Sequence, residues 1–193
     1  MAITDLPSDW SFWILLPDRE EGPEVVDASW NVELKEPLFF AQEEFTFISP
    51  FQVNAHARWA DQSVMVEIDL EATISVPCVR CLELTDIALR THFMYLYSLR
   101  DFVSSGREQE ADEHIVLVDS LENRLDITPQ VWESLILSLP LHPLCREECK
   151  GLCPICGASL NEGDCGCNRQ AIDPRLSDLL KMKEDDLEEK EGN

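Results

Sequence analysis

Hydrophobic and polar residues alternate through the middle of the chain, and this alternation has the period of a β-strand. The clearest runs span residues 53–59, 64–76 and 87–97. Because successive side chains of a strand point to opposite faces, each run would place one apolar face against a core. The second face of the third run mixes apolar with charged residues. We therefore expect that strand to be covered on both sides.

Short connections join these runs. Ala60–Ser63 has the length of a tight turn, and a cysteine pair separates the second run from the third. Strands joined in this way pair with their neighbours in antiparallel fashion, so the pattern predicts an antiparallel meander. Further extended segments are expected at residues 25–34, 45–53 and 115–118. Before them lies an irregular lead-in, which we expect to pack through its aromatic residues Trp10, Phe12 and Trp13.

Helical spacing occurs near residue 130. Thr128 and Pro129 are typical of a helix cap and a first helical position, and apolar residues follow at helical spacing until Pro140. This predicts a helix over about 129–139. A second short helix is predicted to begin at Asp173 and to run through Met182.

These elements predict an α+β protein, in which an antiparallel β meander packs against a helix and is followed by a cysteine-rich, zinc-binding carboxy-terminal segment. A length of 193 residues suffices for one such core with a small appendage. The expected divisions are an amino-terminal lead-in with the first strands (1–50), a β-rich core with the helix (51–144), the zinc-binding segment with the short helix (145–182) and an acidic tail (183–193).

The charge of the chain is strongly negative. Fifteen Lys and Arg against 38 Asp and Glu give a formal net charge of −23. Residues 1–144 hold most of this excess, whereas residues 145–181 carry 5 basic against 6 acidic side chains. So acidic a surface repels a phosphate backbone, and a basic protein is the better expected partner. Direct contact with RNA is expected to be possible only for the near-neutral segment, residues 145–181. An acidic surface is equally consistent with a role in solubility alone.

The early part of the sequence carries no recognisable export signal. The longest early apolar run, Trp10–Leu16, is too short to cross a bilayer, and no basic residue precedes it as in a signal peptide. We therefore expect a cytoplasmic protein without a membrane segment, in which thiols persist and bind metal.

The eight cysteines fall into four pairs. Two pairs have C-x-x-C spacing, which lets one tight turn aim two sulfurs at one tetrahedral ion; the other pairs are separated by three residues and by one glycine. Four pairs suffice for two four-thiolate zinc sites of the closed, structural kind. The expected ligands are Cys78, Cys81, Cys145, Cys149, Cys153, Cys156, Cys165 and Cys167.

The last four cysteines lie within 15 residues, so they can form one compact site. The two cysteines near residue 80 would then meet Cys145 and Cys149, and this second site would tie the sheet to the carboxy-terminal segment. The sequence also allows Cys149 to join the later cluster, or one site to remain unfilled.

The sequence is also compatible with other chemistry at these thiols. An iron–sulfur cluster uses the same ligands. A redox dithiol would favour a C-x-x-C that opens a helix, whereas the first pair lies in β sequence. The four histidines are scattered, and His142 near the cysteines is at most a stray ligand. No phosphate-binding loop, dinucleotide motif or nucleophile elbow is present, so we expect no enzymatic activity.

Several motifs occur in an order that resembles one family. They are the Cys-Val-Arg-Cys-Leu-Glu sequence at 78–83, the helix ending Pro-Leu-Cys145, the stretch Cys149-Lys-Gly-Leu-Cys-Pro-Ile-Cys-Gly157, Leu160-Asn161, Cys165-Gly-Cys167 and Asp173-Pro-Arg-Leu176. Over about residues 51–182 the chain is similar to the YceD family, the large ribosomal RNA subunit accumulation proteins. Some members of that family lack the later cysteines.

The resemblance implies a non-enzymatic role in ribosome biogenesis, supporting accumulation of the large-subunit ribosomal RNA. The acidic body would bind a basic ribosomal protein or a large-subunit precursor. Two other hypotheses stay open. One is a zinc-ribbon adaptor for proteins unrelated to ribosomes, and the other is a thiol-redox protein with an accessible, low-pKa cysteine.

Overall fold

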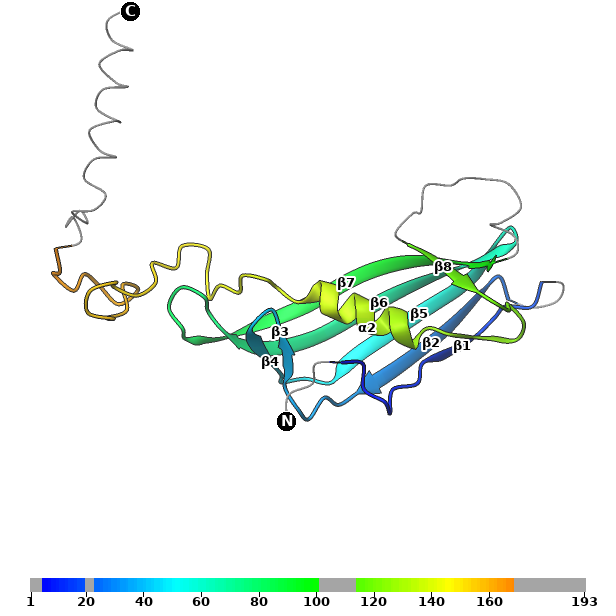
Figure 1. Ribbon diagram of the computed structural model, residues 1–193, viewed down its shortest axis with the longest axis horizontal. Coiled ribbons are helices and arrows are strands. Elements are labelled where there is room, and N and C mark those ends of the chain that lie inside the picture. The colour runs from blue at the N-terminus through cyan, green and yellow to red at the C-terminus, as the bar shows by residue number, and fades with distance from the viewer. Residues whose placement is uncertain (1–4, 20–22, 101–113, 169–193) are drawn as a thin grey trace, which may run out of the picture. The chain divides into compact units, whose positions relative to one another are not determined.

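The computed structural model describes residues 5–19, 23–100 and 114–168. Contacts divide the chain into two units, residues 1–147 and residues 148–193. The predicted helix at 173–182 and the acidic tail at 183–193 lie outside the described residues. The described part contains nine strands and the helix α2 (Figure 1): β1 (Trp13–Leu15), β2 (Val25–Val32), β3 (Leu38–Phe40), β4 (Glu43–Phe47), β5 (Phe51–Ala60), β6 (Ser63–Pro77), β7 (Leu84–Leu99), β8 (Ile115–Val118), β9 (Arg124–Asp126) and α2 (Thr128–Ser138).

The three alternating runs form the centre of the sheet. Strands β5, β6 and β7 pair in antiparallel order, and the β6–β7 register holds without interruption from Val64 opposite Tyr97 to Pro77 opposite Leu84. Asp61 has a φ of 58° in the turn between β5 and β6, a conformation that short polar side chains tolerate. The predicted antiparallel meander is therefore confirmed.

Other strands extend this sheet. β2 pairs with β5 on one side, β4 pairs with the end of β6, and β8 runs parallel to the end of β7. β1 and β9 form a separate antiparallel pair. The described residues are thus mostly antiparallel β with one eleven-residue helix, and the prediction of an α+β fold is corrected to a mostly β fold, because the strands far outweigh this helix.

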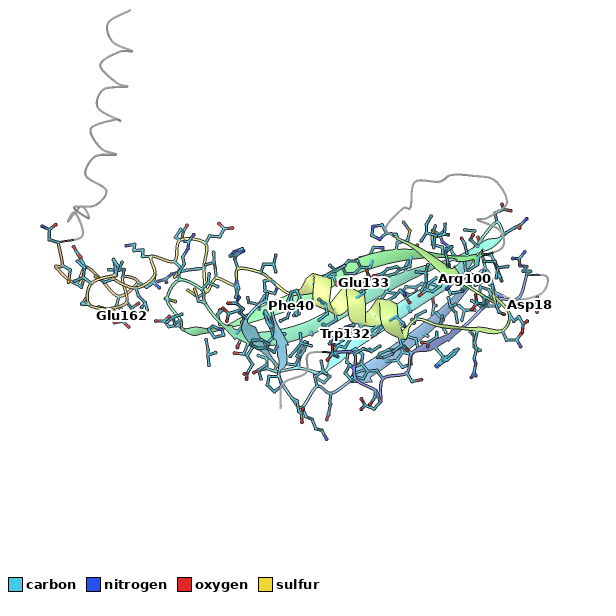
Figure 2. The ribbon with its side chains drawn as sticks, in the orientation of Figure 1. Asp18, Phe40, Arg100, Trp132, Glu133 and Glu162 are labelled. Carbon is cyan, nitrogen blue, oxygen red and sulfur yellow. The ribbon has the colours of Figure 1, made fainter. Side chains whose placement is uncertain are left out.

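Helix α2 lies across the sheet (Figure 1) and buries one stripe of side chains against it. Val131 and Leu135 are fully buried, and the buried Ser134 hydroxyl lies 3.0 Å from the Tyr95 hydroxyl. Trp132 and Glu133 follow one another on this helix (Figure 2). Trp132 packs edge-to-face with Trp10, so the amino-terminal segment and the helix share one core.

Thr128 does not cap the helix as the sequence predicts. The cap position is Ile127, which makes no side-chain capping bond. The Thr128 hydroxyl instead accepts a hydrogen bond of 2.8 Å from the Phe12 backbone N–H. The amino-terminal segment therefore satisfies a polar group at the helix start, which only the folded structure reveals.

The outer face of β7 is open rather than covered. Ala88, Arg90, His92 and Met94 are exposed there, so the expectation of a strand covered on both sides is wrong in the described structure. The neighbouring strands β5 and β6 carry a pair of opposite charge, Arg58 with Glu67 at 3.2 Å. Such exposed pairs contribute little to stability, and they keep this face polar.

Trp13 also departs from expectation. Trp10 and Phe12 pack against the core, but Trp13 is 44% exposed, and the Arg124 guanidinium lies 4.5 Å from its ring centre. Its place on β1, with alternate side chains pointing outward, accounts for this exposure.

Candidate metal centres

The first C-x-x-C pair forms the turn between β6 and β7. The backbone N–H of Leu82 donates to the Cys78 carbonyl at 2.8 Å, and the N–H of Cys78 donates to the Glu83 carbonyl at 2.9 Å. Leu82 has a φ of 62°, which is unusual for a side chain with a Cβ. The turn thus closes on itself directly after Cys81.

The second C-x-x-C pair repeats this arrangement in the carboxy-terminal unit. The N–H of Gly157 donates to the Cys153 carbonyl at 2.8 Å, and the N–H of Cys153 donates to the Ala158 carbonyl at 2.8 Å. Gly157 has a φ of 73°, in the same left-handed region as its counterpart in the first turn. Two segments distant in sequence therefore form the same local structure.

Both turns aim backbone N–H groups at the first sulfur of the pair. Burial raises the pKa of Cys78, but the N–H groups of Cys145, Cys81 and Arg80 outweigh it, so that the pKa falls to about 6. The N–H groups of Cys156 and Ile155 lower the pKa of Cys153 to about 6 as well. Both turns therefore favour the thiolate, the form of cysteine that binds metal.

Two further contacts bring the segment after α2 to the first turn. The N–H of Val79 donates to the Pro143 carbonyl at 2.9 Å, and an Arg80 guanidinium nitrogen donates to the Glu147 carbonyl at 3.2 Å. Cys145 lies between these two anchor points in sequence. Its sulfur is consequently 3.7 Å from that of Cys81.

The eight thiols form two groups of four, and none makes a disulfide. Within each group all the sulfurs lie within 4.8 Å of one another. The sequence predicts the same two groups. The first cluster is Cys78, Cys81, Cys145 and Cys149, and the second cluster is Cys153, Cys156, Cys165 and Cys167.

The distances suit a tetrahedral ion. With zinc–sulfur bonds of about 2.3 Å, the sulfurs of a tetrahedron are about 3.8 Å apart. The distance of 3.7 Å between the sulfurs of Cys81 and Cys145 agrees with this edge. Four thiol donors and no oxygen donor favour zinc or an iron–sulfur cluster over magnesium or calcium. Either cluster can hold a metal ion, whose identity the geometry leaves open.

Without a cation, the second cluster favours a protonated thiol at Cys167. The thiols of Cys156 and Cys165 act with burial to raise the pKa of Cys167 to about 12. A bound divalent ion would offset this repulsion and release the proton of Cys167. Metal affinity should accordingly rise with pH.

A redox role fits these thiols less well. The two cysteines with lowered pKa values, Cys78 and Cys153, are 0% and 2% exposed, whereas a reactive thiol must be reached by its substrate. His142 is exposed and lies outside both clusters, so it is not placed as a ligand.

Sequence reasoning missed one polar residue at the first cluster. The Asn161 side-chain amide lies 3.3 Å from the Cys149 sulfur and donates to it. Asn161 is part of the Leu160-Asn161 motif that supports the family resemblance. That motif does not indicate what the residue does.

Gly157→Ala should weaken metal binding at the second cluster. An added Cβ would meet no atom within 4 Å, so the cost comes only from the left-handed backbone conformation. That cost is about 1–2 kcal/mol, which corresponds to roughly a 5- to 30-fold loss of affinity. Cobalt titration of the reduced protein measures it, with Ser159→Ala in the same hairpin as the control. Equal affinities for the two variants would contradict the account of this turn.

Among the residues that the structure describes, no helix is both long enough and apolar enough to cross a membrane.

Comparison with known proteins identifies relatives across most of the chain. An uncharacterized protein of Mycobacterium tuberculosis is 30% identical over 152 residues, covering 71% of each chain. Protein YlbN of Bacillus subtilis is 29% identical over 165 residues, covering 81% of this chain and 87% of its own. A chloroplastic protein of Arabidopsis thaliana is 25% identical over 166 residues, covering 75% of this chain and 51% of its own. No solved structure matches.

The Arabidopsis relative is named large ribosomal RNA subunit accumulation protein YCED homolog 1. The family described as large ribosomal RNA subunit accumulation protein YceD matches residues 66–183, a range that includes both cysteine clusters. The chain belongs to the YceD family.

Proposed function

We propose that this protein supports accumulation of the large-subunit ribosomal RNA in the cytoplasm by binding an assembly partner, and that it does so without catalysis. The observation that carries the proposal is the family match over residues 66–183. The name of the Arabidopsis relative points to the same process.

The charge of the chain suggests what the partner is. A net charge of −23 favours association with a basic protein and opposes contact with a bare phosphate backbone. Ribosomal proteins are basic as a class because they bind RNA. We therefore propose a basic ribosomal protein, free or within a large-subunit precursor, as the partner.

Binding rather than catalysis agrees with the chemistry of the clusters. A catalytic zinc keeps an open position for water or substrate, whereas four protein thiolates fill a tetrahedral ion completely. Metal in such sites would stabilise local structure and present the loops around it. The exposed side chains of Val79 and Leu82, on the first turn, could then contact a partner.

Affinity purification of the tagged full-length chain from its own cells tests this proposal. We expect large-subunit precursors and a basic ribosomal protein to be enriched over small-subunit precursors, and raised salt to release them. Depletion of the protein should lower the ratio of large- to small-subunit ribosomal RNA. Unchanged ribosomal RNA together with non-ribosomal partners would instead support an adaptor outside ribosome assembly.

A further inference from the structure

We propose that Asn161 belongs to the first metal centre and that the hairpin between Cys149 and Asn161 couples metal binding at the two clusters. The inference rests on metal binding by both clusters and is independent of the ribosomal role. The hairpin and its hydrogen bonds lie within the carboxy-terminal unit, residues 148–193.

The hairpin has ligands of both clusters at its two ends. Cys149, a member of the first cluster, lies at its base, and the pair Cys153 and Cys156 of the second cluster forms its tip. The stem is closed by the N–H of Leu160, which donates to the Gly151 carbonyl at 2.9 Å, and by the antiparallel bridge of Leu152 with Ser159. An ion held at the tip would therefore order the chain that leads to the base.

The side chain of Asn161 fixes that base with two hydrogen bonds. Its oxygen accepts from the Lys150 N–H at 2.9 Å, and its nitrogen donates to the Cys149 sulfur at 3.3 Å. This orientation of the amide is the one that satisfies both partners. Cys149 is only 3% exposed, so the protein and not water must supply this donor.

A donor at this sulfur favours a bound ion. Four thiolates around a divalent cation carry a net charge of −2, and an amide N–H directed at one sulfur offsets part of it. Groups that orient metal ligands in this way typically contribute 10- to 100-fold in metal affinity. Asn161 is therefore a positioning residue for the first cluster.

Coupling follows from the shared hairpin. If the second cluster is empty, metal binding at the first cluster must itself order the stem and bring Asn161 to Cys149, at a cost in conformational entropy. An ion already at the tip removes that cost. By linkage, an ion bound at the first cluster must raise the metal affinity of the second cluster by the same factor.

Cobalt titration of the reduced, metal-free full-length chain tests both parts, because the thiolate-to-cobalt absorption reports each site. In a Cys153→Ser/Cys156→Ser background only the first cluster binds, and in a Cys78→Ser/Cys81→Ser background only the second does. We expect the first cluster to bind more weakly in its isolated background than in the intact chain.

Asn161→Ala in the intact chain should weaken the first cluster by 10- to 100-fold and should leave the affinity of the isolated second cluster within about twofold. Asn161→Asp keeps the acceptor for the Lys150 N–H but places a negative charge at the Cys149 sulfur, so its loss should be larger. Ser159→Ala is the matched control, because its buried hydroxyl has no hydrogen-bond partner in the described structure.

Equal first-cluster affinities for Asn161→Ala and Ser159→Ala would overturn the role of Asn161. Equal first-cluster affinities with and without a functional second cluster would overturn the coupling. Retained cobalt binding by the isolated second cluster in the Asn161→Ala variant would show that the hairpin still folds, so a loss at the first cluster could not be ascribed to misfolding.

Discussion

The variant Cys78→Ser should lose one of two metal ions and much of the stability of the chain. The Cys78 sulfur is fully buried, receives three backbone N–H groups and lies with three other sulfurs. Because binding of structural zinc is also folding free energy, we expect a destabilisation of about 4–5 kcal/mol, a size reached by few substitutions other than those that remove a metal or a disulfide.

Metal content and chemical unfolding measure this effect on the same sample. His142→Ala is the control, because His142 is exposed and lies outside both clusters. It should keep both ions and wild-type stability. A Cys78→Ser protein that retains two ions, or that unfolds at the same denaturant concentration as His142→Ala, would show that Cys78 is not a ligand.

Leu135→Ala should produce the second large effect. Leu135 is fully buried between α2 and the sheet, in the same core as Phe51, Val66 and Ile68. Removing its side chain loses apolar burial and leaves a cavity, at a cost of about 2–5 kcal/mol. A lower midpoint of denaturant unfolding, with an unchanged slope, is the expected result.

Leu137→Ala on the same helix is the matched control. Leu137 is 61% exposed, so its loss should change the free energy of unfolding by less than about 0.5 kcal/mol. Equal effects of the two substitutions would contradict the packing of α2 on the sheet.

The long strands could be predicted because their pattern repeats. In β5 and β6 nearly every second side chain is buried, and the same alternation of apolar and polar residues runs through their sequences. The hairpin of β3 and β4 gave no such signal. Its turn places Ala41 and Gln42 at φ values of 50° and 70°, where glycine or asparagine is usual, so packing rather than turn preference must hold it.

The cysteine groups were predictable for a similar reason. C-x-x-C spacing dictates a local turn, and four pairs of cysteines leave few ways of combining them into two groups of four. Asn161 could not be found in this way, since its role depends on the closure of a hairpin that brings residues 150 and 161 together. Hydrogen bonds of this kind depend on the folded backbone, and no fixed spacing of residues in the sequence predicts them.

The balance of strand and helix differs from the prediction for another physical reason. The predicted helix near residue 130 exists, at Thr128–Ser138, and the extended segment predicted at 25–34 is the strand at 25–32, but the strands at 13–15 and 38–40 were not predicted. Short strands depend on pairing with distant partners, and this pairing is not encoded in their own sequence. The fold is therefore mostly β.

Native mass spectrometry of the protein purified without chelator, compared with its denatured mass, tests the central claim most directly. The account predicts two zinc ions per chain together with eight reduced thiols. A chain with no metal, with a single ion or with iron, or one whose thiols are oxidised to disulfides, would contradict the prediction of two closed four-thiolate zinc sites.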